Sequence, residues 1–140
     1  MSALTASRLP KPFVAGGMSL LSTAEQTYAG GLACFDTSTG LVKKGAASNT
    51  LIPIGVYKED KLVASGGSAS IQFPQNQYFM WFANSASADL IAQAQVGSVC
   101  YIVDDQTVAK TSNSSARSQA GTVFAVDAKK GVLVKLALPV

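Results

Sequence analysis

Two neighbouring carboxylates, Asp104 and Asp105, are the side chains of this sequence that most suggest chemistry. They lie in the stretch YIVDDQTVAK, residues 101–110, of a chain with only eight acidic residues. Paired carboxylates can hold a hard cation, but such a site needs further oxygen ligands at close spacing, and only Gln106 and Thr107 follow. Aspartate also favours tight turns, because its side chain bonds the nearby backbone. We therefore predict a turn here and no metal site.

Catalytic chemistry has few candidate residues. Histidine is absent, which removes the commonest general base and the commonest metal ligand. The sequence contains no nucleophile elbow, Walker-type loop or dinucleotide-binding glycine pattern. Cys34 and Cys100 lie in the apolar contexts GLACFD and SVCYIV, which are typical of small buried residues. We predict a protein that is not an enzyme and needs no cofactor, with both cysteines reduced and buried.

The composition suggests a surface that is partly covered by other protein. Hydrophobic residues make up 48% of the 140-residue chain and charged residues only 14%, against roughly 25% charged residues in average soluble domains. The net charge is +3, but the basic residues are scattered, and the closest groups are the turn-like pairs Lys43–Lys44 and Lys129–Lys130. We expect assembly with protein partners, and this charge distribution gives no support for a nucleic-acid partner. No apolar run is long enough to predict a membrane span.

Short apolar segments rich in β-branched and aromatic residues alternate with clusters of Gly, Ser, Asn, Asp and Thr. This rhythm predicts an all-β fold, which we expect to be a two-sheet β-sandwich or a jelly-roll-like barrel. The turn sequences KEDK at 58–61 and DAKKG at 127–131 predict hairpins, with Gly131 in the left-handed conformation. Only the region near residues 88–96 suggests a helix, at most one short one, which Asp89 could cap.

The first 13 residues, MSALTASRLPKPF, differ from the rest of the chain. They are small, polar and interrupted by prolines, which predicts an extended N-terminal arm, residues 1–13, before a single β-domain, residues 14–140. Residues 8–24 place basic residues before a short apolar stretch, as a secretory signal does. Two prolines and a glycine pair interrupt that stretch, so we do not expect a signal peptide.

Residues 31–57 resemble residues 97–123 at an offset of 66. Six of the 27 positions are identical, whereas about two identities are expected from residue frequencies alone. The identical pairs are Gly31/Gly97, Cys34/Cys100, Val42/Val108, Lys44/Lys110, Ser48/Ser114 and Gly55/Gly121. We treat internal duplication as a hypothesis, in which each copy is a strand, an Asp-bearing turn, a strand, a Ser-rich loop and a Gly-led strand.

The stretch QYFMWFAN, residues 77–84, contains the only tryptophan and three of the ten other aromatic residues. In a strand, Tyr78, Met80 and Phe82 would lie on one face and the other aromatic side chains on the opposite face. Three interpretations remain open: a core strand covered on both sides, a strand with one face on another subunit, or rings that stack on nucleic-acid bases, which the lack of adjacent Lys or Arg weakens. The candidate residues for self-association are Tyr78, Phe79, Met80, Trp81 and Phe82.

The passage VGSVCYIVDDQTVAKTSNSSARSQAGTVFAVDAKKGVLVKL, residues 96–136, resembles the C-terminal part of the small decoration, or cement, proteins of tailed-bacteriophage heads. In that family a "vyvvDdqTV" strand-turn-strand is followed by a Ser/Asn-rich loop, an "aGtV" strand and a closing "GVwV" strand, and Leu133 stands here in place of the usual Trp. The passage AGGLACFDTSTGLVKKGAASNTLIPIGVYKE, residues 29–59, is similar to the "G-lv…g…a…iGv" text of the same group. The resemblance covers about residues 28–137.

This resemblance implies a non-enzymatic β-domain on the outer surface of the capsid of a virion, made in the cytoplasm of the bacterial host. Its partners would be the major capsid protein and other copies of the chain, as a homodimer or a trimer. The candidate capsid contacts in the arm are Arg8, Pro10, Lys11, Pro12 and Phe13, where the prolines favour an extended segment. The alternative is a carbohydrate- or surface-binding β-sandwich module of a virion fibre, in which Trp81 and the polar residues 75–77 would bind the ligand.

Overall fold

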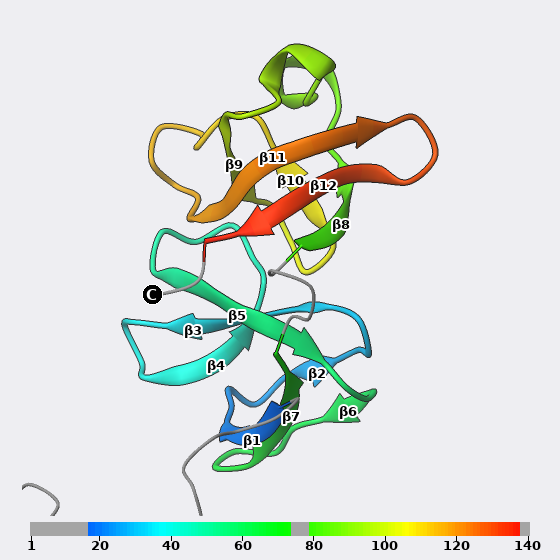
Figure 1. The fold of residues 1–140 in the computed structure, drawn as a ribbon. Coiled ribbons are helices and arrows are strands. Elements are labelled where there is room, and N and C mark those ends of the chain that lie inside the picture. The colour runs from blue at the N-terminus through cyan, green and yellow to red at the C-terminus, as the bar shows by residue number, and fades with distance from the viewer. Residues whose placement is uncertain (1–16, 74–78, 138–140) are drawn as a thin grey trace, which may run out of the picture.

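The computed structural model describes residues 17–73 and 79–137, and its chain is all-β, as predicted (Figure 1). The strands are β1 (Gly17–Leu21), β2 (Gln26–Thr27), β3 (Leu32–Asp36), β4 (Leu41–Lys44), β5 (Leu51–Tyr57), β6 (Lys61–Leu62), β7 (Ser68–Gln72), β8 (Phe79–Asn84), β9 (Val99–Ile102), β10 (Thr107–Ala109), β11 (Gln119–Asp127) and β12 (Gly131–Leu136). Two single-turn 3-10 helices, η2 (Ser87–Asp89) and η3 (Gln93–Gln95), lie between β8 and β9, where at most one short helix was predicted.

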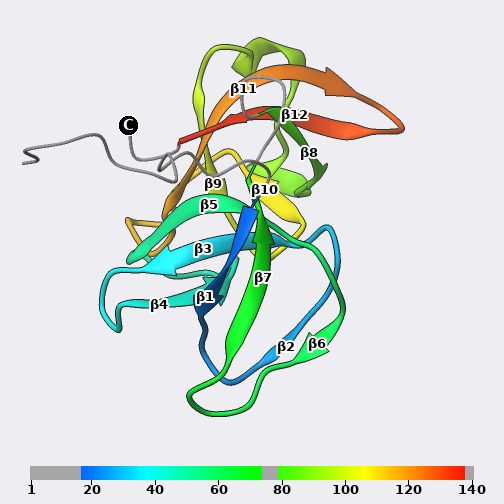
Figure 2. The ribbon, with the colours of Figure 1, turned by 60° about the horizontal axis from the view of Figure 1, so that its bottom comes forward.

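Five strands of the first half form the N-terminal sheet, in the order β1-β7-β5-β3-β4 and with antiparallel neighbours throughout. Its two edges meet at one point, because Ser22 forms a parallel bridge with Val42 of β4. Beside this bridge, Thr23 N donates to Val42 O at 2.9 Å. The short strands β2 and β6 pair with each other next to this sheet (Figure 2). The sheet is therefore curled, with its edges joined only at one end.

Five strands of the second half form the C-terminal barrel, in the closed order β10-β8-β12-β11-β9. All neighbours are antiparallel except β8 and β10, which close the barrel with a short parallel ladder at Ala83 and Asn84. Next to this ladder, Ser85 N donates to Val108 O at 3.1 Å. Only the end of β8 takes part in the closure, as only the end of β1 does in the N-terminal sheet.

The two halves share one topology. Taken in chain order, β1, β3, β4, β5 and β7 correspond to β8, β9, β10, β11 and β12, and both sets are arranged first-fifth-fourth-second-third. The closing bond from Thr23 to Val42 corresponds to the bond from Ser85 to Val108. The acceptors are 66 residues apart (108 − 42), which is the offset found in the sequence. The shared topology supports the duplication hypothesis.

Gly55 and Gly121, one of the repeated pairs, occupy equivalent crowded positions. A Cβ atom at Gly55 would lie 2.3 Å from Gln72 O, and one at Gly121 would lie 1.9 Å from Lys135 O, both far inside van der Waals contact. In each half the preceding residue is left out of the ladder with the neighbouring strand, which makes a β-bulge. A side chain at either glycine would therefore collide with the backbone of the next strand, which lies against the glycine beside the bulge.

One apolar core joins the two halves. The larger cluster combines side chains from the barrel with Leu32, Cys34 and Leu51 of the N-terminal sheet, and a smaller cluster fills the N-terminal sheet itself. Ser118 strengthens the junction, because its hydroxyl accepts from Leu51 N at 2.9 Å and donates to Ser48 O at 2.6 Å. The two halves therefore pack together. The predicted arm, residues 1–13, is not among the residues that the structure describes.

Two finer expectations are not met. A two-sheet sandwich or jelly roll is not confirmed, because the strands form a curled sheet and a closed barrel. The prediction of a hairpin at residues 58–61 is wrong, because the strands on either side of this turn do not pair with each other. Strand β5 pairs with β3 and β7, whereas β6 pairs with β2. The hairpin at 127–131 is confirmed: it joins β11 to β12, with Gly131 at φ 96°. Both sequences contain residues that favour tight turns, but the partner strand with which each strand pairs depends on burial along the whole strand.

Candidate functional site

The aspartate pair forms a turn, as predicted. Asp104 Oδ1 accepts a hydrogen bond from Gln106 N at 2.9 Å, the bond that an aspartate makes when it shapes a turn. The turn also contacts the N-terminal sheet, because Leu32 N donates to Asp105 O at 2.7 Å. Within residues 17–73 and 79–137, no group of His, Cys, Asp and Glu could hold a metal ion. These residues connect β9 to β10 and anchor the barrel to the sheet.

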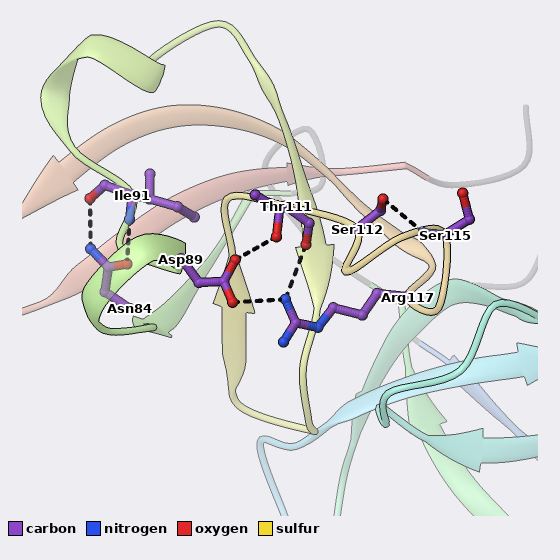
Figure 3. A network of polar contacts seen from close by, with 7 residues as sticks. All are labelled: Asn84, Asp89, Ile91, Thr111, Ser112, Ser115 and Arg117. Carbon is purple, nitrogen blue, oxygen red and sulfur yellow. Dashed lines mark hydrogen bonds and ion pairs between the residues drawn. The ribbon is translucent and has the colours of Figure 1, made fainter.

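A second polar cluster ties the connection between β8 and β9 to the loop after β10 (Figure 3). Arg117 Nη1 lies 3.2 Å from Asp89 Oδ2 and donates to Thr111 O at 3.1 Å. The Thr111 hydroxyl donates to Asp89 Oδ1, and this bond, with that from Arg117, holds the pKa of Asp89 below its usual value. The carboxylate is therefore ionised and paired at neutral pH. This cluster holds a loop in place.

Both cysteines are free and buried, as predicted. Burial raises the pKa of each thiol to about 12, and for Cys34 the charge of Glu25 adds to the effect. At neutral pH each side chain is a neutral thiol, whereas the thiolate is the form that attacks substrates and binds metals. The cysteines therefore act as small core residues.

Strand β8 has one buried face and one exposed face. Phe82 is 2% exposed, and Met80 packs against the same core cluster. Trp81 lies on the opposite face and is 40% exposed. The interpretation of β8 as a core strand covered on both sides is therefore wrong for the described chain. Among the candidate self-association residues that the structure describes, Phe79 and Trp81 lie on the outward face of β8, where they can contact another molecule.

The outward side chains of three neighbouring strands form what we call the aromatic face: Phe79, Trp81, Phe124 and Leu133. Leu133 in β12 is the direct ladder partner of Trp81. Phe124 lies at a bulge in β11 and is 60% exposed. Its ring centroid lies 4.8 Å from that of Phe79, with the rings at 63° to each other. The four residues are thus one continuous apolar surface, not scattered exposed side chains.

Three lysines border the aromatic face. Lys130 Nζ lies 5.6 Å from the centroid of the Trp81 ring, its neighbour Lys129 is exposed in the same turn, and Lys135 is exposed on β12. Asp127 is the one acidic residue in β8, β11, β12 and this turn, and it accepts bonds from the backbone N–H groups of Lys129 and Lys130, which lower its pKa. Three positive charges and one negative charge give this region a net charge of +2.

The corresponding strands β1 and β7 of the N-terminal sheet contain no aromatic residue, although β1 exposes Leu21 and β3 exposes Phe35. By ladder register, Trp81 and its partner Leu133 correspond to Ser19 and its partner Ser70. The positions equivalent to Phe79, Trp81, Leu133 and Lys135 hold Gly17, Ser19, Ser70 and Gln72. These four positions therefore hold no large apolar side chain, so the topology does not need aromatic residues at these positions.

An open groove of about 770 Å³ lies beside the aromatic face, and Trp81 forms part of its lining. Leu90 and Val126 supply apolar lining, and Lys129 is among its charged residues. The amide of Asn84 also lines the groove, but its oxygen and nitrogen bond the backbone of the following segment at 2.9 and 2.7 Å. The groove thus combines an apolar lining with the amide of Gln106 and with one acidic and two basic side chains, Asp127, Lys129 and Lys130.

Several candidate residues lie outside the described part of the chain. They are the arm residues Arg8, Pro10, Lys11, Pro12 and Phe13, together with Tyr78 and the polar residues 75–77. Sequence reasoning missed Phe124, Leu133 and Lys135. The alternation in GVLVKL, where Val132, Val134 and Leu136 are buried, could have placed Leu133 and Lys135 on the outward side.

Comparison of the chain with protein-family models, with curated proteins and with solved structures gives no match. Across residues 17–73 and 79–137, no helix is long and apolar enough to cross a membrane.

Proposed function

We propose that this chain is a structural virion protein that binds the outside of a tailed-phage head and stabilises contacts between major capsid subunits. The main support is the aromatic face, a continuous apolar surface that the fold does not require and that the described chain leaves uncovered. Exposed aromatic side chains are enriched at the centres of protein interfaces. The resemblance of residues 28–137 to cement proteins suggests the partner.

A binding role agrees with the state of the ionisable groups. Asp89 is paired with Arg117, and both thiols are neutral because burial raises the pKa of each to about 12. The sequence contains no histidine. A protein that clasps many equivalent sites on a lattice needs modest affinity at each one, and it can bind through shape and apolar contact alone. We therefore propose a protein that is not an enzyme.

The test is co-sedimentation of purified protein with undecorated phage heads, together with the thermal stability of the heads. We expect saturable binding and a higher disruption temperature for decorated heads. Heads that do not retain the protein at any concentration would contradict the proposed function. Removing residues 1–12 tests the proposed arm contact separately: if head binding and head stability are unchanged, the arm does not contribute.

We also propose that copies of the chain contact one another, by default as a two-fold dimer, because an isologous contact reuses one surface and closes by itself. Light scattering over a range of concentrations measures this directly. A protein that stays monomeric when free and that shows no copy-to-copy contact on the head would contradict it.

The alternative function is binding of carbohydrate or another surface ligand, as in a virion fibre. The observation that favours it is the groove beside Trp81, since aromatic rings commonly pack against bound ligands. A glycan array separates the two proposals, because saccharide binding without head binding would support the alternative.

A further inference from the structure

We propose that the aromatic face binds an acidic protein surface on the capsid, with an apolar centre flanked by Asp or Glu residues, and not a second copy of the chain. This inference rests on the proposed function and identifies the surface that performs it. Three observations lead to it: the pattern of apolar and charged residues on the face, its net charge, and the arrangement of its rings.

The face has the anatomy of a protein interface. Trp81, Leu133 and the contacting rings of Phe79 and Phe124 form an apolar centre. The lysines lie at its border, as charged residues do in interfaces whose centres are dry. Lys130 lies in the turn that precedes β12, and Lys135 lies near the other end of that strand, about 13 Å from Gly131 at the usual rise per residue. A fitting partner therefore places carboxylates on both sides of an apolar patch.

The net charge argues against a second copy at this face. A two-fold contact would set one region of net charge +2 against another. The carboxylate of Asp127, which accepts two backbone N–H groups at 2.8 Å each, supplies only one negative charge per copy against three lysines. Like charges brought together across an interface oppose association, while opposite charges favour it and speed encounter. Any self-association is then expected to use another surface.

The arrangement of the rings argues against single-stranded nucleic acid. Base stacking needs ring faces that are open and can lie parallel to a base. The Lys130 ammonium lies over the ring of Trp81, and Phe79 and Phe124 meet edge to face at 63°. Phe79 and Phe124 therefore do not offer two parallel faces, an arrangement that suits apolar side chains better than stacked bases.

Trp81 is the only tryptophan in the chain, so the change in fluorescence, after the emission of the heads alone is subtracted, reports on occupancy of the face. The experiment titrates undecorated heads into the full-length protein and measures both co-sedimentation and Trp81 emission. Wild-type protein should bind with a blue shift of Trp81 emission. The double variant Lys130→Glu/Lys135→Glu should bind at least about tenfold more weakly. Phe124→Ser should weaken binding by a similar factor, about tenfold, since central aromatic residues dominate interface energies.

Matched controls change exposed residues outside β8, β11 and β12. Lys58→Glu/Lys110→Glu changes the net charge by the same amount as the double variant, and Leu62→Ser replaces a side chain that is 74% exposed. Each control should alter head binding by less than about twofold. Urea unfolding of every variant establishes that it is folded before binding is compared.

The outcomes separate this inference from the proposed function. If wild-type protein does not bind heads, the proposed function fails and the inference fails with it. If wild-type protein binds but the face variants bind as well as the controls, or Trp81 emission does not change, the inference fails while head binding stands. If the face variants lose self-association instead, or if oligo(dT) shifts Trp81 emission as the heads do, the occupant has been wrongly identified.

Discussion

Replacing Phe82 and Phe124 separately by alanine tests which side chains belong to the core and which to the aromatic face. Phe82 is 2% exposed and Phe124 is 60% exposed. A fully covered phenylalanine buries roughly 200 Å², and each Å² removed from water contributes about 25 cal/mol. The free energy of unfolding should therefore fall by about 4 to 5 kcal/mol for Phe82→Ala and by at most about 2 kcal/mol for Phe124→Ala.

Urea unfolding followed by the emission of Trp81 measures both changes. With a urea dependence of about 2 kcal/mol per molar, the unfolding midpoint should fall by about 2 M for Phe82→Ala and by at most about 1 M for Phe124→Ala. Head binding should show the opposite order, since Phe124 lies on the surface that we assign to the partner. Equal losses of stability, or a larger loss for Phe124→Ala, would show that the bulge in β11 does not turn Phe124 outward and would refute the assignment.

Three further predictions concern the packing and the ionisable groups. Gly55→Ala and Gly121→Ala should each reduce the free energy of unfolding by more than about 3 kcal/mol, because the new Cβ would meet a backbone oxygen. The control Gly40→Ala, which places its Cβ in open space at φ 75°, should reduce it by about 1 kcal/mol. Similar losses at all three positions in urea unfolding would contradict this prediction. Native protein should not react with a thiol reagent at neutral pH, and denatured, unreduced protein should react at two thiols; a denatured count of zero would indicate a disulfide. Hydrogen bonds lower the pKa values of Asp36, Asp89 and Asp127 in the folded state, so the unfolded state binds more protons at acidic pH. Urea midpoints should accordingly be constant above about pH 5 and fall as the pH drops below about 4, the usual range of aspartate. Asp89→Asn should make the midpoint depend less on pH. Midpoints that rise on acidification would contradict the predicted direction of the pH dependence.

Because the two halves share one topology, the residues at equivalent positions can be compared directly. Equivalent positions keep the residues that the fold needs, such as Gly55 and Gly121 beside their bulges. They differ where the fold leaves a choice, as Ser19 and Trp81 do on corresponding strands. The aromatic face belongs to the second kind, which is why we assign it to binding and not to stability.

The sequence by itself determined the features that depend on nearby residues. The alternation of apolar segments with turn residues predicted the all-β class, and the turns at Asp104 and at Gly131 follow from side chains that bond their own backbone or adopt positive φ. The repeated strands were recognisable from identical residues at an offset of 66, because comparing residues at a fixed spacing requires no knowledge of which residues are in contact. Burial of both cysteines followed from their apolar neighbours.

Only the tertiary structure decided which strands pair and therefore which side chains meet. The hairpin at residues 58–61 was a reasonable prediction from turn chemistry, yet β5 pairs with β7, because pairing depends on the burial of whole strands. The run around Trp81 had no lysine beside it in the sequence, but the pairing of β8 with β12 brings Lys130, 49 positions along the chain (130 − 81), to 5.6 Å from its ring. The bulge in β11 that exposes Phe124 is likewise a property of the ladder. Charge and apolar surface combine into a site only where long-range register places them on one face.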